Sequence, residues 1–306
     1  MRPPAPESVL HPGAWTHRHI SANGIRLHVA ECGEGPLVVL LHGFPEYWFA
    51  WRHQLVGLAE RGFRAVAVDL RGYGDSDKPP RGYDLWTLAG DIAGLVPALG
   101  ESRAAVVGHG WGGVVGWTVA AVHPRRVSAL VTIGAPHPLA IRRTVVRDRW
   151  GQARALSAVA RFQLPRLPER DLRVDEGARV ERIMRAWSGG AWGASDDFGE
   201  AVAHYRSAIR VPGVAHCAME YYRWAVRSQL RAEGRRFATA VARPAELPVL
   251  GLHGADDPFL LPGTAAASRP WAGERYTLEV WPGAGHFPHE ECPDAVTARV
   301  ARFLGC

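Results

Sequence analysis

The chain has 306 residues, of which 47% are hydrophobic and 22% charged; this balance allows a sizeable buried core and excludes a disordered chain. The formal net charge is +6, but Lys78 is the only lysine and the arginines are scattered among acids, which argues against nucleic-acid binding. The length suits one large domain, or one domain that carries an insertion.

Targeting and cofactor signals are absent from the sequence. No apolar run approaches the roughly 20 residues of a membrane helix, and the Pro-rich residues 1–6 lack the apolar segment of a signal peptide. The cysteines at positions 32, 217, 292 and 306 form no CxxC pair. We therefore expect a cytoplasmic monomer or homodimer without metal, cofactor, nucleic-acid or membrane partners, acting on a small molecule.

One local cluster of positive charge departs from the scattered pattern. Arg142, Arg143, Arg147 and Arg149 lie close together and could attract an anionic ligand. A solvated helix face is the simpler interpretation of such a run.

Short β-rich runs alternate with helical stretches along most of the chain. Runs at 16–20 and 25–30 flank Asn23-Gly24, a pair typical of a β-hairpin. Apolar runs typical of strands buried on both faces lie at 36–41, 64–70, 104–108, 129–133, 248–252 and 276–280. Amphipathic segments lie near 47–61, 84–99, 112–123 and 293–304. This alternation predicts an α/β fold, a mostly parallel twisted sheet with helices on both faces.

The alternation breaks between about residues 137 and 245. There Arg, Ala, Trp and Glu recur at helical spacing, with prolines as punctuation, over a stretch too long for a connecting loop. The pattern predicts a core domain of residues 1–136 and 246–306, interrupted by a helical cap of residues 137–245.

The segment VVGHGWGG at residues 106–113 joins a buried strand to a helix and allows two interpretations. Its glycines satisfy the dinucleotide pattern G-x-G-x-x-G, but the acid expected at the end of the next strand is missing, because that strand ends Ile133-Gly-Ala-Pro136. The alternative is a nucleophile elbow, G-x-Nuc-x-G, a crowded turn flanked here by Gly108 and Gly112. We favour the elbow.

Three further motifs stand at predicted strand ends in the order that accompanies an elbow. HGFP at 42–45 follows the first buried strand, GADD at 254–257 follows a late strand, and GHF at 285–287 follows the last strand. They match the places of an oxyanion loop, a triad acid and a triad histidine.

These segments closely resemble the epoxide hydrolase and haloalkane dehalogenase branch of the α/β-hydrolases. The resemblance includes HGFPE at 42–46, DLRGYGDSDKP at 69–79, APHP at 135–138 and GHFPHE at 285–290. It covers most of the chain and is weakest in the cap. That branch carries an aspartate in GHDWGG, and the matching residue here is Gly110.

The resemblance assigns roles to the remaining site residues. It implies that Asp257 orients His286 as a general base, with Asp256 as the alternative acid. It also implies that the backbone N–H groups of Phe44 and Trp111 form an oxyanion hole. In the family, the aspartate attacks the epoxide carbon and forms an ester, which Gly110 cannot do, and His109 is expected to point away.

The cap segment EYYR at 220–223 resembles the family's Asn-x-Tyr-Arg segment, which implies that Tyr222 donates a hydrogen bond to the epoxide oxygen; an aromatic core residue is the alternative. The family's second cap tyrosine is replaced by Arg161. We expect a hydrophobic substrate, and an aromatic one is an option. The pocket residues that we expect are His42, Trp48, Trp187, Tyr221 and Phe287.

Gly110 leaves four functions open. The chain could be an epoxide hydrolase that uses noncovalent water attack, or a nucleophile-deficient variant of a covalent enzyme. It could be a cofactor-independent lyase or cyclase in which His286 moves a proton. It could also be a catalytically dead ligand-binding scaffold, although Asp257, His286 and the oxyanion loop are all retained. A haloalkane dehalogenase is a related alternative, but its usual Asn is replaced here by Gly134.

Overall fold

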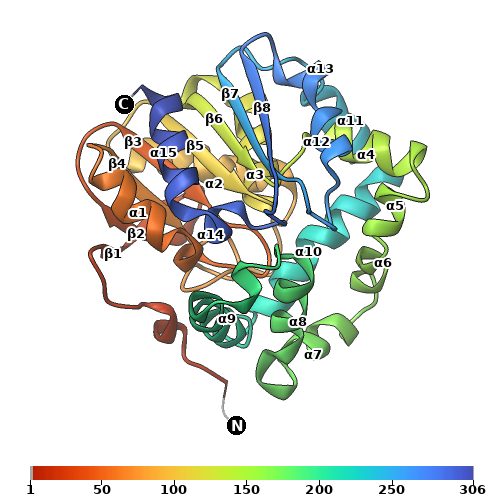
Figure 1. The fold of residues 1–306 in the computed structure, drawn as a ribbon, viewed down its shortest axis with the longest axis horizontal. Coiled ribbons are helices and arrows are strands. Elements are labelled where there is room, and N and C mark those ends of the chain that lie inside the picture. The colour runs from red at the N-terminus through yellow and green to blue at the C-terminus, as the bar shows by residue number, and fades with distance from the viewer. Residues whose placement is uncertain (1–2, 306) are drawn as a thin grey trace.

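A computed structural model describes residues 3–305 and contains an eight-stranded sheet in the order β1-β2-β4-β3-β5-β6-β7-β8 (Figure 1). The strands are β1 Thr16–Ala22, β2 Ile25–Cys32, β3 Leu37–Leu41, β4 Arg64–Val68, β5 Ala104–His109, β6 Val127–Ile133, β7 Val249–Gly254 and β8 Tyr276–Trp281. β2 is antiparallel to both of its neighbours, and the pairs from β4 to β8 are parallel. The predicted α/β fold and all of its predicted strands are confirmed.

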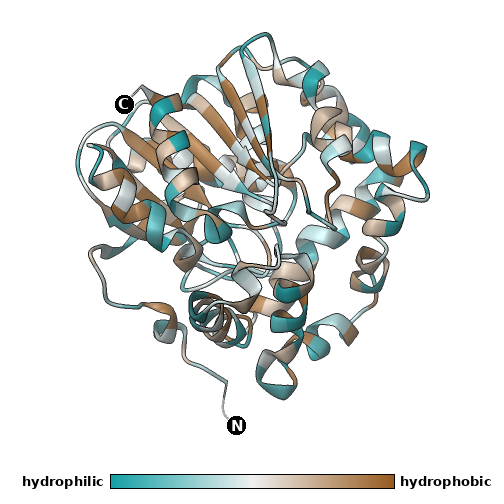
Figure 2. Ribbon diagram, in the orientation of Figure 1, coloured by the Kyte–Doolittle hydropathy of each residue, from teal (hydrophilic) through white to brown (hydrophobic). Residues whose placement is uncertain are grey.

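The β1–β2 hairpin forms where the sequence predicted it. Asn23 and Gly24 have φ values of 47° and 77°, as a two-residue hairpin turn with a right-handed strand twist requires. The central strands β3 and β5 are buried along their whole length, which explains their uninterrupted apolar sequences. The hydrophobic strands form the centre of the molecule in Figure 2.

Helices cover both faces of the sheet, with α1 and α15 in front of it and α2 and α3 behind it in the view of Figure 1. These and the other helices outside the cap segment are α1 Arg52–Ala59, α2 Leu85–Ala98, α3 Trp111–Val122, α12 Pro262–Ala266, α13 Arg269–Ala272, α14 Pro288–Glu291 and α15 Pro293–Leu304. The helix expected over 47–61 is divided, because Trp48–Trp51 form a 3-10 turn before α1.

Between β6 and β7, residues 138–240 contain helices without a strand. They are α4 Pro138–Arg147, α5 Gln152–Ala155, α6 Ala158–Phe162, α7 Leu167–Arg173, α8 Ala178–Trp187, α9 Asp196–Ala208, α10 Val214–Arg227 and α11 Ala232–Ala240. We call residues 137–245 the cap, as in the sequence prediction. The cap helices α6–α10 lie beside the carboxyl ends of the parallel strands (Figure 1). No helix within residues 3–305 is long and apolar enough to cross a membrane.

Candidate active site

The elbow at Gly110 is a sharp, crowded turn between β5 and α3. Gly110 has φ 49° and ψ −116°, and its N–H donates to the carbonyl of Ile133 at 3.1 Å. A Cβ atom on Gly108 would lie 2.4 Å from the Gly112 carbonyl carbon, and one on Gly112 would lie 2.1 Å from the Leu41 carbonyl oxygen. Because those neighbours are backbone atoms that cannot move aside, both flanking positions require glycine.

Position 110 itself has room for a side chain. A Cβ atom there would meet only Gly43 Cα at 3.5 Å and His286 Nε2 at 3.7 Å, both ordinary van der Waals distances. The strand-to-helix turn thus aims residue 110 at the imidazole of His286. The positive φ of 49° nevertheless strains any residue other than glycine at this position, although an added Cβ atom would not clash.

His286 and Asp257 form a buried hydrogen-bonded pair. The Nδ1 atom of His286 lies 2.7 Å from Asp257 Oδ2, and Asp257 Oδ1 accepts from the backbone N–H groups of Phe259 and Leu260 at 2.8 and 2.9 Å. Burial alone would raise the pKa of Asp257, but the charge and hydrogen bond of His286 outweigh it and lower that pKa. Asp257 therefore stays a carboxylate that holds Nδ1–H.

The other ring nitrogen of His286 is open to chemistry. Among residues 3–305, no group hydrogen-bonds to Nε2, although the residue is only 2% exposed. With Nδ1–H donated to Asp257, Nε2 carries the lone pair and faces position 110. This arrangement can accept a proton from a group bound there.

Tyr222 stands on the cap helix α10 and packs against the two residues expected to form the oxyanion hole. Its ring lies 5.5 Å from the ring of Phe44 and 5.1 Å from that of Trp111, and both pairs are edge to face. Burial raises the pKa of Tyr222, while a hydrogen bond with the Trp111 side chain acts in the opposite direction. The phenol thus remains protonated and able to donate a hydrogen bond.

Trp187 and Phe287 lie beside His286, as expected for pocket residues. The Trp187 ring is 5.5 Å from the His286 ring and nearly perpendicular to it, and the Phe287 ring is 5.2 Å away. The Trp187 ring also stacks on the Phe259 ring at 4.0 Å. The backbone N–H of His286 donates to the backbone carbonyl of Trp187 at 2.7 Å. Sequence reasoning missed Phe259, whose place follows from the loop that carries Asp257.

The structure places His42 behind the oxyanion loop and not at its surface. His42 Nε2 accepts from the Leu70 N–H at 3.1 Å, so Nδ1 carries the proton and donates to the Gly43 carbonyl at 2.8 Å. Burial lowers the pKa of His42, which keeps the ring neutral. Contrary to our expectation of a pocket residue, His42 has no ring nitrogen to offer to a ligand and instead shapes the backbone before Phe44.

Trp48 and Tyr221 also serve the scaffold. Trp48 donates to the Val9 carbonyl at 2.9 Å and packs against Trp15 at 5.2 Å, under the N-terminal segment. Tyr221 donates to the Arg71 carbonyl at 2.8 Å, and neither side chain is exposed. We expected both residues to line the pocket. In the structure, the polar atom of each side chain instead donates to a backbone carbonyl.

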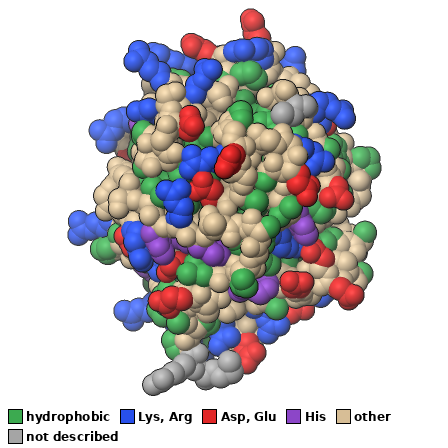
Figure 3. Space-filling model, turned by 90° about the vertical axis from the view of Figure 1, so that its left-hand side faces the viewer, with side chains coloured by type: hydrophobic (Ala, Val, Ile, Leu, Met, Phe, Trp, Pro, Cys, Tyr) green, Lys and Arg blue, Asp and Glu red, His purple; other side chains and the backbone are tan. Residues whose placement is uncertain are grey.

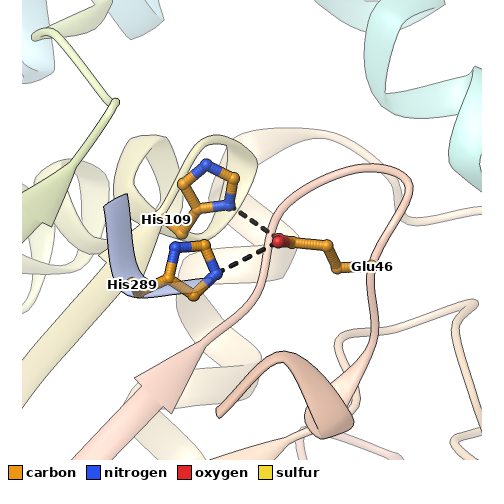
Figure 4. A group of neighbouring side chains, drawn as sticks. All are labelled: Glu46, His109 and His289. Carbon is orange, nitrogen blue, oxygen red and sulfur yellow. Dashed lines mark hydrogen bonds and ion pairs between the residues drawn. The ribbon is translucent and has the colours of Figure 1, made fainter. Parts of the chain in front are cut away.

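Figure 4 shows a buried group of three ionisable residues, Glu46, His109 and His289. One of them, His109, contacts the backbone of His286. Glu46 Oε2 lies 2.7 Å from His109 Nδ1, and Glu46 Oε1 lies 3.0 Å from His289 Nε2. His109 Nε2 in turn lies 2.9 Å from the carbonyl oxygen of His286. His109 therefore points away from the elbow, as predicted, and connects Glu46 to the backbone of His286.

The protonation of this group follows from its contacts. Burial alone would raise the pKa of Glu46, but His109 and His289 hold it well below its usual range. Burial would lower the pKa of His109, but Glu46 outweighs this and raises it, whereas burial lowers the pKa of His289 to about 4. The result is a Glu46–His109 ion pair beside a neutral His289. Both nitrogens of His109 face acceptors, which suits an imidazolium.

Two groups within residues 3–305 have the ligand types of a metal site. One is Glu46, His109 and His289, and the other is His53, Asp197 and Glu290. In the first, the Glu46–His109 hydrogen bond occupies the atoms that a metal would use. In the second, Arg52 contacts Glu290 at 2.6 Å and Asp197 at 2.7 Å, and so supplies the positive charge. Arg52 thus accounts for the second group, whereas in the first group both ring nitrogens of His289 and Oε1 of Glu46 form no hydrogen bond within residues 3–305.

Arg161 and Gly134 mark two differences from the expected family pattern. The Arg161 side chain is half exposed, pairs with Asp171 at 2.5 Å and lines a surface hollow of about 360 Å³ on the cap, away from His286. A Cβ atom on Gly134 would lie 2.8 Å from the His286 carbonyl and 3.3 Å from its Nδ1. An asparagine at position 134 would therefore displace His286.

Comparisons with known proteins identify the family to which the chain belongs. A family model described as alpha/beta hydrolase fold matches residues 36–293. The AB hydrolase superfamily protein YfhM of Bacillus subtilis is 34% identical over 93% of this chain and 96% of its own length, and epoxide hydrolase A of Mycobacterium tuberculosis is 33% identical over 95% and 98%. The crystal structure of epoxide hydrolase VrEH1 from Vigna radiata superposes with a TM-score of 0.79 at 28% identity, over 95% of this chain and 98% of that one. The chain belongs to the α/β-hydrolase fold family, in its epoxide hydrolase branch.

Proposed function

We propose that this chain hydrolyses a hydrophobic epoxide by direct attack of water, with the His286–Asp257 pair as general base. The observation that carries the proposal is the 3.7 Å between His286 Nε2 and the Cβ position of residue 110, combined with an Nε2 that has no partner within residues 3–305. A base with a free lone pair beside a small open space is the arrangement that water activation needs.

In the proposed step, water opens the epoxide ring. His286 Nε2 takes a proton from water as the water oxygen attacks an epoxide carbon. The C–O bond of the ring breaks, and its oxygen takes the proton of the Tyr222 hydroxyl and becomes the second hydroxyl of a diol. The proton that His286 removed from water then leaves the imidazolium and, through solvent, restores the Tyr222 phenol. Asp257 stabilises the imidazolium that forms in this step. The backbone N–H groups of Phe44 and Trp111 would hold polar atoms beside the elbow.

The substrate class is supported by the walls of the site. Trp187, Phe259 and Phe287 surround His286, and Phe44 and Phe162 pack around Tyr222. These aromatic faces favour an apolar or aromatic substituent next to the epoxide. The raised pKa of Tyr222 supports its role as hydrogen-bond donor.

The test is a single-turnover assay in H₂¹⁸O, with enzyme in excess over a panel of aryl and aliphatic epoxides. Direct attack predicts that the chain places ¹⁸O in the diol of the first turnover and that His286→Gln removes the activity. A Gly110→Asp variant that attacks through its carboxylate would instead give a first diol without label and a labelled aspartate.

Other outcomes would contradict the proposal in distinct ways. Diol from Gly110→Asp alone would identify a covalent hydrolase scaffold that has lost its nucleophile. Conversion to an isomer or elimination product would identify proton transfer by His286 without hydrolysis. Saturable binding without turnover in either protein, and without an effect of His286→Gln beyond affinity, would identify a ligand-binding scaffold.

A further inference from the structure

The end of α4 and the loop that follows it expose apolar side chains that nothing in residues 3–305 covers. Trp150 is 88% exposed and Val146 is 70% exposed. Single exposed apolar residues are common on proteins, but an indole exposed to this extent beside a second apolar side chain is not. Both residues belong to the segment in which the sequence contains a cluster of four arginines.

The four arginines of that cluster flank the two apolar residues in the sequence. Arg142, Arg143, Arg147 and Arg149 are exposed, and none of them forms an ion pair or hydrogen bond with another group in residues 3–305. The segment 138–154 contains one acid, Asp148, whose carboxylate is used to accept the N–H groups of Gly151 and Gln152 at 2.8 and 3.0 Å. This surface therefore carries the four positive charges of the arginines against the single negative charge of Asp148.

Other parts of the surface differ from this one. Figure 3 shows a face on which basic and acidic side chains are intermixed. Some exposed arginines elsewhere have acidic partners, for example Arg18 with Glu31 at 2.8 Å and Arg185 with Glu181 at 3.3 Å, whereas others, such as Arg231, have none among the described residues. What distinguishes one surface is therefore an almost fully exposed tryptophan among unpaired arginines. We call it the Trp150 face: Val146 and Trp150 with Arg142, Arg143, Arg147 and Arg149.

The Trp150 face lies beside the loop that carries Asp257. Gln152, two residues after Trp150, donates to the Phe259 carbonyl at 2.9 Å and accepts from the Leu261 N–H at 2.9 Å. The Thr144 and Thr264 hydroxyls of α4 and α12 are 3.1 Å apart. Figure 1 shows α4 and α5 at the right-hand side, where the cap begins next to α12.

We propose that the Trp150 face docks the protein onto the surface of an anionic lipid bilayer. Tryptophan favours the boundary between headgroups and acyl chains, because its ring is apolar and its N–H is polar. Arginines around it attract anionic headgroups, and each basic side chain near such a surface raises partitioning about fivefold. This differs from the sequence expectation that the protein has no membrane partner.

Charge and composition favour a lipid surface over an acidic protein. The face combines the two residue types that peripheral membrane segments use, basic side chains and a large aromatic one, within nine residues of chain. A bilayer provides anionic charge and an apolar layer together, without needing a complementary shape. Docking would also place the site beside the phase in which a hydrophobic substrate concentrates, but the docking proposal does not depend on turnover.

The test is co-sedimentation of the full chain with vesicles of phosphatidylcholine containing about 30% phosphatidylglycerol. We expect binding at low salt that falls steeply in 0.5 M NaCl, and weak binding to pure phosphatidylcholine vesicles. Trp150→Ser should reduce the partition coefficient on the order of tenfold. The double variant Arg142→Ser/Arg143→Ser should reduce it by about twentyfold or more.

Matched controls separate this face from general surface effects. Leu230→Ser removes an apolar residue that is 90% exposed elsewhere, and Arg18→Ser/Arg26→Ser removes two arginines that have acidic partners; neither should change binding by more than about twofold from net charge alone. Brominated lipids should quench a part of the tryptophan fluorescence that Trp150→Phe lacks. Circular dichroism and thermal unfolding would establish that each variant is folded.

Three results would overturn the proposal. The first is the absence of binding to anionic vesicles at low salt, which would make an acidic protein the next occupant to test. The second is equal loss of binding in the matched controls. The third is unchanged binding in Trp150→Ser without lipid quenching of Trp150, which would mean electrostatic capture without insertion.

Discussion

The core and the cap hold their parts of the candidate site in different ways. In the core, the site residues lie at the ends of parallel strands, where backbone atoms are closely packed. In the cap, Tyr222 lies on a helix that is held by side-chain contacts. Core positions such as Gly112 have a carbonyl oxygen where a side chain would be. Cap positions such as Gly199 on α9 have no atom within 4 Å of an added Cβ. The contrast indicates that the elbow tolerates little change, whereas an exposed helix position in the cap such as Gly199 has room for a side chain.

The largest effect should come from Gly112→Ala in the core. The added methyl group would lie 2.1 Å from the Leu41 carbonyl oxygen, so β3 or α3 must shift. We expect a loss of more than about 3 kcal/mol in the free energy of unfolding, or no folded protein. Chemical denaturation would measure it, and a stable variant with wild-type activity would show that the elbow is less rigid than its contacts indicate.

Removing the buried charge of Glu46 should have the next largest effect. Glu46→Gln leaves His109 without its carboxylate in a fully buried site, which is expected to cost about 3–5 kcal/mol of unfolding free energy. The control is Glu181→Gln in the cap, where partly exposed pairs with Arg185 and Arg206 should contribute about 0–1 kcal/mol. Equal losses in the two variants would contradict the contrast between core and cap.

Acid should destabilise the core through His289. Its pKa is about 4 in the folded protein against 6.5 when unfolded, so the unfolded chain binds the proton first as the pH falls. The free energy of unfolding should therefore fall by about 1–3 kcal/mol between pH 6.5 and pH 4 because of this residue. Stability curves of wild type and His289→Asn should differ in slope over that window and run parallel above pH 7. Identical slopes would exclude His289 as the cause.

The neighbouring cap tyrosines offer a comparison between function and packing. If the proposed function holds, Tyr222→Phe should lower kcat by about 10–100-fold and leave the free energy of unfolding nearly unchanged. Tyr221→Phe should lower unfolding free energy by about 1 kcal/mol, because the Arg71 carbonyl loses its donor, and have little effect on kcat. If Tyr221→Phe lowered kcat and Tyr222→Phe lowered only the free energy of unfolding, Tyr221 would be the functional residue and Tyr222 the packing residue.

The smallest effect should be a gain in stability at Gly199 in the cap. Gly199 lies inside α9 with open space around it, so alanine should stabilise the helix by about 0.5–1 kcal/mol. A shift of a few degrees in the thermal midpoint would show it. Destabilisation there would mean that the cap is as constrained as the elbow.

Local patterns were sufficient to predict most of the fold. The uninterrupted apolar sequences of β3 and β5 predicted strands buried on both faces. Asn23-Gly24 predicted a hairpin turn, in which both residues have positive φ values. The glycine spacing around residue 110 reported a crowded elbow. These signals lie within a few residues of the structure that they specify, so they can be read from the chain alone.

The roles of individual aromatic and ionisable residues needed the tertiary structure. His42 belongs to the HGFP motif and Trp48 was expected in the pocket, yet His42 Nε2 accepts from the backbone N–H of Leu70 and Trp48 donates to the carbonyl of Val9. The Glu46–His109 pair joins residues 63 positions apart, and Asp171, not a ligand, meets Arg161. A residue's type limits its chemistry, but only its neighbours decide which atoms are already used.

The sequence by itself determined the α/β architecture, the order of elbow, acid and histidine, and the absence of a side chain at Gly110, because these depend on local pattern and chain order. The tertiary structure decided that Asp257 holds Nδ1 of His286, that Nε2 faces the space at residue 110, and that a buried Glu46–His109 pair supports the histidine from behind. Those features arise from contacts between strand ends far apart in the chain, which hydrophobic packing brings to one edge of the sheet.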